Sequence, residues 1–319
     1  MYKYTIIVPC YNIADKARGL ISMLESDRDD VQLIFVDDCS KDNTFSSLKK
    51  MAEESEHVVV VQTDHNGGPG VARNKALDLA QGKYILFSDA DDRMDLSILE
   101  DIDTFLLDVN HDVDMIVFPY SIERKGKSGA VDNFKKYNSG EQVAIVDVAA
   151  DFGMLFARVF RNDIIQENEL RMPERRTGED KCSMIMYLIH TKTIYKMSRV
   201  YYTYVMNKGS ITHKRSGTSN QLTTFEVLKP MYEQYFPSIV EKMFAENYLI
   251  TKAKWLYMNK AKLREIKEWC IAANKMYPRW IKKIDYNGQN LYRKILYYAI
   301  SKNCAYLIKL VMWMRTVLY

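Results

Sequence analysis

Short apolar runs alternate with helical patterns over the first 120 residues, and this alternation constrains the fold more than any other feature of the sequence. Each run is continuous and rich in β-branched residues, and the runs span residues 5–9, 31–36, 58–62, 84–87 and 115–118. Such runs are typical of parallel strands that are buried on both faces. Helical patterns lie between them, at roughly 14–26, 42–55, 69–80 and 95–108. Together they predict an α/β fold with a doubly wound, mostly parallel sheet.

Polar side chains follow three of the predicted strands. Tyr11 follows the first run, Asp37 and Asp38 follow the second, and Asp89 and Asp91 follow the fourth. Ligands of doubly wound sheets bind outside the carboxyl ends of the strands. We therefore expect these side chains to share one binding crevice.

The sequence Asp89-Ala-Asp-Asp92 is a candidate metal site. Taken alone, a D-x-D sequence is a weak signal, because most acidic pairs are solvated surface. Directly after a buried strand, however, clustered carboxylates are costly unless a cation or hydrogen bonds offset their charge. Mg²⁺ or Mn²⁺ fits this need, since Mg²⁺ binds one or two carboxylates together with substrate phosphate oxygens. We assign Asp89 and Asp91 to the metal and expect Asp92 to cap the next helix or turn the loop.

In order and spacing, five blocks of the sequence resemble the signature blocks of family 2 glycosyltransferases with the GT-A fold. The blocks cover residues 5–12, 35–44, 66–74, 82–92 and 178–180. Five ordered blocks are far more specific than any single motif. The resemblance implies a GT-A domain, placed at 1–215, that binds a UDP-sugar with Mn²⁺ or Mg²⁺. It also implies transfer of a hexose or N-acetylhexosamine to a hydroxyl of a saccharide, as in bacterial cell-surface polysaccharide synthesis.

The resemblance assigns donor-binding roles to residues at the strand ends. Pro9 and Tyr11 would border the base, and the Asp38 carboxylate would accept a hydrogen bond from the uracil edge. The alternative is that Asp37 and Asp38 only cap the helix beginning near Asp42.

The glycine-rich segment 66–70 lacks the G-x-G-x-x-G spacing of a dinucleotide fold. By resemblance, Gly67 would let the backbone approach the nucleotide, and Arg73 and Asn74 would open or line the following helix. Ala90 belongs to the same donor-binding set as Asp89. A simple tight turn is the alternative for the glycines.

Glu179 and Asp180 stand at the predicted start of a helix at 179–190. Acidic residues favour a helix N-terminus, so an N-terminal cap is one explanation for the pair. By the family pattern, Asp180 is the general base that takes a proton from the acceptor hydroxyl, and Glu179 orients Asp180 or a sugar hydroxyl. Direct displacement of this kind inverts the anomeric configuration.

Residues 202–212 resemble the closing element of the family, in which a serine lies near the diphosphate. Relatives often have an arginine early in this element, whereas this sequence has Val205 and Asn207 there. Lys208, His213, Lys214 or Arg215 would supply the positive charge instead. We assign Lys208 and Ser210 to the diphosphate and predict that residues 205–217 form a lid that orders on donor binding.

The region 216–319 is predicted to be helical, basic and rich in aromatic residues. Residues 220–319 hold 17 of the 45 basic residues and 7 of the 41 acidic ones, and no acidic residue follows Asp285. The last two predicted helices, 290–300 and 304–318, fall short of a membrane span. They suit a surface-lying anchor on anionic lipid, in keeping with a lipid-linked acceptor. Alternatively, the apolar faces of these helices pack within the helical region or against a second copy in a homodimer.

Several function classes are disfavoured by the sequence. The five cysteines are scattered, which favours reduced packing residues. An apolar signal segment is absent from the first residues, so we expect a cytoplasmic protein, peripheral to the inner face of the plasma membrane if the tail binds lipid. A nucleic-acid partner is not expected, because no such motif accompanies the basic tail. Two alternatives remain: a catalytically impaired glycan-binding or scaffold module, and a sugar-phosphate nucleotidyltransferase.

Overall fold

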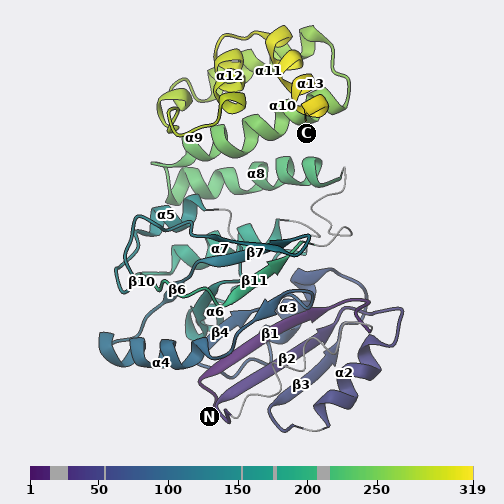
Figure 1. The fold of residues 1–319 in the computed structure, drawn as a ribbon, viewed down its shortest axis with the longest axis vertical. Helices are drawn as coiled ribbons and strands as arrows, with labels where there is room; N and C mark the ends of the chain where they lie inside the picture. Colours follow the sequence, from purple (N-terminus) through teal and green to yellow (C-terminus); the bar gives the residue numbers. More distant parts are fainter. Residues whose placement is uncertain (15–27, 54, 152–153, 175–177, 207–215, 319) are drawn as a thin grey trace. The chain divides into compact units, whose positions relative to one another are not determined.

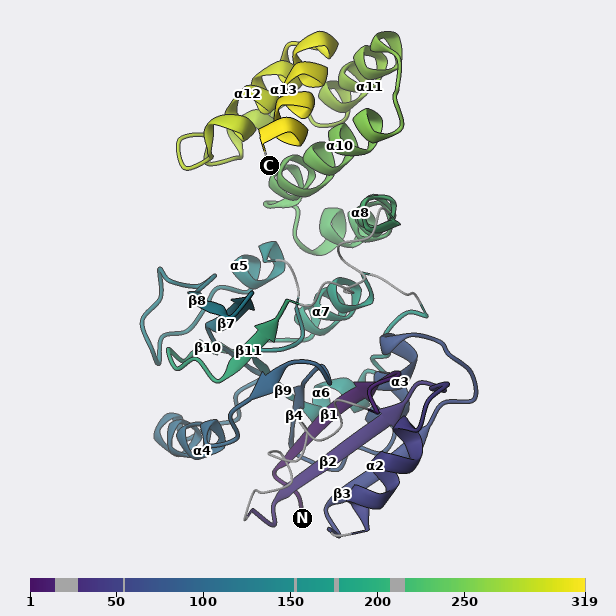
Figure 2. The ribbon, with the colours of Figure 1, turned by 45° about the vertical axis from the view of Figure 1, so that its right-hand side comes forward.

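The computed structural model describes residues 1–14, 28–53, 55–151, 154–174, 178–206 and 216–318 (Figure 1). The chain divides into two compact units, Met1–Ser210 and Ile211–Tyr319. Unit 1 contains both sheets, and unit 2 is helical, as Figure 2 shows in green to yellow. The helix predicted at 14–26 lies outside the described residues.

A seven-stranded sheet forms the centre of unit 1, in the order β10-β6-β9-β4-β1-β2-β3. Strands β3, β2, β1 and β4 are parallel, and β9 runs antiparallel to both β4 and β6. These strands are β1 Tyr4–Cys10, β2 Val31–Asp37, β3 Val58–Gln62, β4 Tyr84–Phe87, β6 Met115–Val117, β9 Arg158–Arg161 and β10 Ile194–Lys196. The predicted mostly parallel α/β sheet is confirmed.

Helices cover both faces of this sheet. The helices of unit 1 are α2 Thr44–Ala52, α3 Pro69–Leu77, α4 Ile98–Val109, α5 Ile145–Ala150, α6 Asn162–Glu167 and α7 Glu179–Ile189. Leu48 of α2 and Ile102 of α4 pack in one cluster with alternate residues of β1. Leu77 of α3, together with side chains of α6 and α7, packs against Phe87 on the other face. Strand β2 is buried along its whole length, which explains its continuous apolar run.

Two helices begin later than the sequence predicts. Helix α2 begins at Thr44 because Asp42 Oδ1 accepts a hydrogen bond from the Thr44 N–H at 3.0 Å. Helix α4 begins at Ile98, and Asp95 Oδ1 accepts from the Ser97 N–H at 3.0 Å. In both cases the aspartate side chain binds the backbone N–H two residues later and forms a local turn. The aspartate therefore precedes the helix instead of being its first residue.

A smaller sheet, in the order β5-β11-β7-β8, lies beside the acidic loop that follows β4. Its strands are β5 Arg93–Met94, β7 Tyr120–Arg124, β8 Lys127–Val131 and β11 Tyr202–Val205. Strands β7 and β8 pair antiparallel and form a hairpin.

Unit 2 has its own core. Its elements are α8 Ser216–Tyr235, α9 Val240–Met243, the π-helical η3 Phe244–Leu249, α10 Ile250–Met258, α11 Leu263–Met276, the 3₁₀ turn η4 Trp280–Lys282, α12 Leu291–Ser301 and α13 Ala305–Leu318. Trp280 is buried and donates its indole N–H to Asn274 Oδ1 at 2.8 Å. The Asn274 amide in turn donates to the Ile300 carbonyl at 2.9 Å, which joins α11 to α12. Among the described residues, no helix is long and apolar enough to cross a membrane.

Candidate active site

Arg73 joins the two halves of the predicted site. It lies on α3, its side chain is 5% exposed, and its guanidinium donates to Asp180 Oδ1 at 2.9 Å and to Asp89 Oδ1 at 2.6 Å. Glu179 Oε1 lies 3.7 Å from the same guanidinium nitrogen that contacts Asp180. The acidic loop after β4 and the first turn of α7 therefore meet at one arginine, although they are about 90 residues apart in the sequence.

More carboxylates than cations gather at this place. Burial alone would lower the pKa of Arg73, but Asp180, Asp89 and Glu179 together raise it above its usual value. Burial, followed by repulsion from Asp180, raises the pKa of Glu179 to about 7. One guanidinium thus faces three acidic groups, and burial raises the pKa of two of them, Glu179 and Asp180.

Asp180 is the more accessible member of the acidic pair on α7. Its side chain is 39% exposed, whereas that of Glu179 is 6% exposed. The helix begins at Glu179, so both residues also lie in its first turn, where negative charge is favoured. The N-terminal position and a chemical role for Asp180 are therefore compatible.

The acidic loop after β4 is held by β11. Tyr202 is fully buried and donates its hydroxyl to Asp92 Oδ2 at 2.5 Å, and the same hydroxyl accepts from the Asp89 N–H at 3.1 Å. Asp92 Oδ1 accepts from the Val205 N–H at 2.8 Å. Burial raises the pKa of Asp92 to about 7. Asp92 was expected to cap the next helix or turn the loop, whereas its carboxylate binds two groups of β11.

The loop presents its other two carboxylates outward. Asp91 is exposed, and the side chain of Asp89 is 36% exposed, while Ala90 between them is partly buried against the core. Two accessible carboxylates with one intervening residue fit a Mg²⁺ or Mn²⁺ ion that takes its remaining ligands from a phosphate and water. The surplus of negative charge around Arg73 also favours a cation. Among the described residues, no group of three or more metal-binding side chains forms a complete site.

The ends of β1 and β2 form the predicted base-binding side. Tyr11 directly follows β1 and is 42% exposed, and Pro9, two residues earlier in the strand, is partly buried. Asp37 is fully buried and accepts from the Ser40 N–H at 3.1 Å and from the Gln62 amide at 2.7 Å. It supports the loop after β2.

Asp38 holds the glycine turn that precedes α3. Its two carboxylate oxygens accept from the N–H groups of Gly67 at 3.0 Å and Gly68 at 2.7 Å, and its side chain is buried. Gly68 has φ 89°, which favours glycine, and a Cβ at Gly67 would approach the Val71 side chain to 2.6 Å. In this arrangement Asp38 fixes the turn, and a contact with a uracil N–H would have to share a carboxylate that these two N–H groups already bind. Base recognition by Asp38 stays a prediction.

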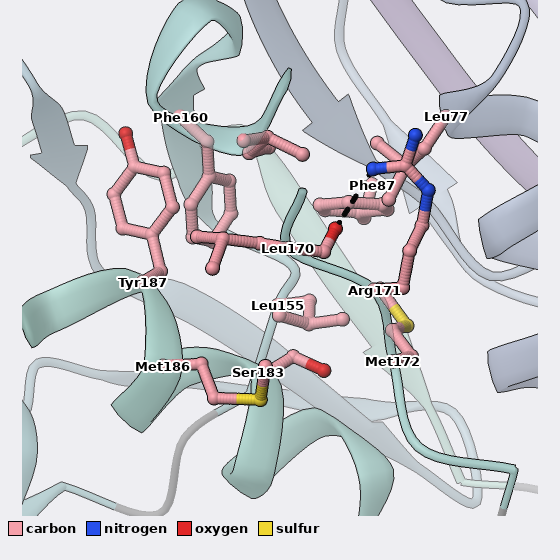
Figure 3. A pocket seen from close by; sticks show the side chains of 11 residues that line it. Leu77, Phe87, Leu155, Phe160, Leu170, Arg171, Met172, Ser183, Met186 and Tyr187 are labelled. Atoms are coloured by element: carbon pink, nitrogen blue, oxygen red, sulfur yellow. Dashed lines mark hydrogen bonds between the residues drawn. The ribbon is translucent and has the colours of Figure 1, made fainter. Parts of the chain in front are cut away.

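Asn74 positions the segment that leads to α7. Its amide donates to the Met172 carbonyl at 2.8 Å and accepts from the Met172 N–H at 2.7 Å. Beside this segment lies a small cavity of about 30 Å³, lined by apolar side chains of α3, β4, β9 and α7 (Figure 3). A cavity of that size holds one water molecule and cannot accept a sugar. The cavity lies against α7, and none of the clustered carboxylates lines it.

The remaining predicted residues, Lys208 and Ser210, lie outside the described residues, as does most of the predicted lid at 205–217. Two contacts were missed by the sequence analysis: the bridge made by Arg73 and the hydroxyl of Tyr202. The sequence shows an arginine in a glycine-rich block and a tyrosine in an aromatic run. It does not show that Arg73 contacts Asp180 or that Tyr202 contacts Asp92, because these partners lie more than 100 residues away.

Comparison with known proteins identifies the family of this chain. Residues 5–167 match the family model described as glycosyl transferase family 2. The poly(ribitol-phosphate) beta-N-acetylglucosaminyltransferase TarS of Staphylococcus aureus is 23% identical over 318 residues, which cover 95% of this chain and 54% of TarS. TarP of the same species, with the same described activity, is 26% identical over 76% of this chain and 75% of its own length. The chain therefore spans about half the length of TarS.

The solved structures show the same fold. The crystal structure of S. aureus TarS 1–349 in complex with UDP-GlcNAc matches 98% of this chain and 91% of that chain, with a TM-score of 0.72 and 20% sequence identity. A mannosyltransferase from Pyrobaculum calidifontis, solved with GDP-Man and Mn²⁺, matches 99% of this chain with a TM-score of 0.56. The predicted GT-A-like fold is confirmed.

Proposed function

Because the chain belongs to family 2 of the glycosyl transferases, we propose that it transfers a sugar from a UDP-sugar to an acceptor hydroxyl, with inversion, in cell-surface polysaccharide synthesis. One observation supports this most directly. Arg73 contacts Asp180 and Asp89 at once, so a group able to accept a proton lies beside a group able to bind a metal–diphosphate. A direct displacement needs these two functions on opposite flanks of one sugar.

The donor side of the reaction rests on the outward-facing carboxylates. Asp89 and Asp91 would hold Mg²⁺ or Mn²⁺, which would neutralise charge on the departing diphosphate. The exposed ring of Tyr11, at the end of β1, is available to border the base. UDP-N-acetylhexosamine is the donor that we propose, since solved structures of the relative TarS contain UDP-GlcNAc and UDP.

The acceptor side rests on Asp180. Its carboxylate would accept the proton of the acceptor hydroxyl as that oxygen attacks the anomeric carbon from the face opposite the diphosphate. Arg73 would hold Asp180 in place through the 2.9 Å hydrogen bond. Burial raises the pKa of Asp180, and the Arg73 charge opposes this shift. A single displacement of this kind inverts the anomeric centre.

The acceptor that we propose is a hydroxyl on a polyol-phosphate polymer or a related saccharide. The names of TarS and TarP state that they modify poly(ribitol-phosphate), and a putative teichuronic acid glycosyltransferase of Bacillus subtilis is 28% identical over 66% of this chain. A lipid-linked acceptor, expected from the sequence, is a narrower form of the same proposal.

Substituting the two key carboxylates separates donor binding from transfer. Asp91→Asn should weaken Mn²⁺-dependent binding of UDP-GlcNAc, measured by calorimetry. Asp180→Asn should keep that binding and lower transfer to poly(ribitol phosphate) by about 10²–10⁴-fold, because a general base contributes on that order. Asp64→Asn is a control for the loss of an exposed carboxylate, since the Asp64 side chain is 97% exposed and makes none of the contacts with Arg73 described above.

Other outcomes distinguish the alternatives. Equal transfer by wild type and Asp180→Asn would exclude Asp180 as the base. Saccharide binding without transfer by the wild type, across a panel of nucleotide sugars, would favour the glycan-binding module. Incorporation of a nucleoside monophosphate into a sugar phosphate would favour the nucleotidyltransferase.

A further inference from the structure

Helix α13 of unit 2 has two chemically different faces. Ala305, Ile308 and Met312 point inward and are buried. On the other side, Tyr306 is 70% exposed and Trp313 is 53% exposed, seven residues apart along one stripe. An outward stripe of a surface helix is ordinarily polar, so these rings call for an explanation.

The outward stripe forms one wall of a groove of about 330 Å³, which we call the Trp313 groove. Its lining residues are Tyr306, Lys309, Leu310 and Trp313 of α13, Tyr257 of α10, and Leu263 at the start of α11. Helix α13, which forms one wall of the groove, is fixed in place because its opposite face packs in the core of unit 2. Its shape is concave, whereas an amphipathic helix that enters a lipid surface presents a convex apolar face.

Positive charge surrounds the groove. Lys309 lies in its lining, and exposed Lys260 and Lys262 lie in the turn that joins Tyr257 to Leu263. Of two nearby carboxylates on α11, Glu268 is offset by Arg264, and the charge of Glu265 is smaller than that of the three lysines together. Glu265 accepts from the Lys262 N–H at 2.6 Å, and Glu268 pairs with Arg264 at 2.8 Å. The net field at the groove therefore favours an anionic partner.

We propose that the Trp313 groove binds a phosphate-bearing polyol or saccharide polymer, as an attachment site additional to the catalytic carboxylate cluster. Aromatic rings offer flat apolar faces for the C–H faces of sugars and polyols, together with a polar edge. The lysines complement the phosphates. Charge complementarity and concave shape together favour such a polymer over a lipid surface or a second copy of the chain. The choice of polymer rests on the proposed function, whereas the groove itself does not.

Binding measurements on the full chain test this inference without turnover. Poly(ribitol phosphate) is titrated into wild type and variants by calorimetry. Trp313→Ala should weaken binding by roughly tenfold, as for other aromatic residues that anchor an interface, and Trp313→Phe should retain most of it. Lys309→Glu should weaken binding, Lys309→Arg should not, and the affinity should fall as salt rises.

Two controls isolate the groove. Tyr298→Ala removes a ring that is 52% exposed on α12 and outside the groove lining, and it should leave polymer affinity unchanged. Binding of UDP with Mn²⁺ should be the same in all variants, which shows that the donor site in unit 1 is intact, and an unchanged circular dichroism spectrum and thermal unfolding profile show that unit 2 is folded.

Several results would overturn the inference: no binding of the polymer by the wild type, or equal binding by wild type, Trp313→Ala and Lys309→Glu. Flotation with phosphatidylglycerol vesicles that depends on Trp313, with polymer affinity unchanged, would assign the groove to lipid. A Trp313-dependent change of oligomeric state by light scattering, without polymer binding, would assign it to a second copy. Trp313-dependent polymer binding by a protein that transfers no sugar would support the groove and contradict the proposed function.

Discussion

Glu179 shows how a buried ionisable residue couples the active site to stability. Its pKa is raised to about 7 by burial and by Asp180, against an ordinary value of 4.5. Between pH 4.5 and 7 the folded protein therefore holds a proton that the unfolded chain has already lost. The free energy of unfolding falls as the pH rises through this window.

We expect Glu179→Gln to remove this pH dependence. From pH 5 to pH 8 the variant should gain about 1–3 kcal/mol in unfolding free energy relative to wild type, measured by urea denaturation. Glu167→Gln, at an exposed position on α6, is the control and should follow the wild-type profile. Parallel profiles for Glu179→Gln and wild type would show that Glu179 titrates normally.

At the scale of elements, strand β11 couples stability to the geometry of the acidic loop. The hydroxyl of Tyr202 on this strand binds both the Asp92 carboxylate and the Asp89 N–H. Removing that hydroxyl leaves buried polar groups of the loop short of a partner, at a cost of about 1–3 kcal/mol.

Tyr202→Phe should therefore lower stability and also weaken Mn²⁺-dependent UDP binding, because Asp89 and Asp91 lose their fixed backbone. Tyr204→Phe, on the same strand, is the matched control and should affect both quantities less. Thermal unfolding and calorimetric titration measure the two effects. Wild-type UDP affinity in a folded Tyr202→Phe protein would contradict a positioning role for Tyr202.

At the scale of the whole molecule, each unit has its own core, and the proposed donor residues all belong to unit 1. A ligand stabilises the segments it binds. We expect UDP with Mn²⁺ to slow hydrogen exchange at the ends of β1, β2 and β4, while exchange around Trp280 and Tyr297 in unit 2 stays unchanged.

The same exchange experiment tests the lid predicted at 205–217. Slower exchange there on adding UDP and Mn²⁺ would support the lid, and unchanged exchange would remove it. Protection confined to unit 2 would contradict the assignment of the donor site to unit 1.

The sequence by itself determined the features that depend on local patterns. Continuous β-branched runs predicted the strands, since burial on both faces requires apolar residues at every position. The runs also placed Asp89 and Asp91 just after a strand, and the helical pattern at 179–190 placed Asp180 at a helix start. The ordered blocks, through their resemblance to a known family, predicted the fold.

Only the tertiary structure decided which of these residues meet. Arg73 and Asp180 are 107 residues apart, and Tyr202 and Asp92 are 110 apart. Their contacts depend on the order and register of strands across the sheet, including the antiparallel pairing of β9, whose direction a local sequence pattern does not indicate. Likewise, Asp38 was visible at a strand end, but the folded chain directs two backbone N–H groups onto its carboxylate, because a buried charge needs such partners.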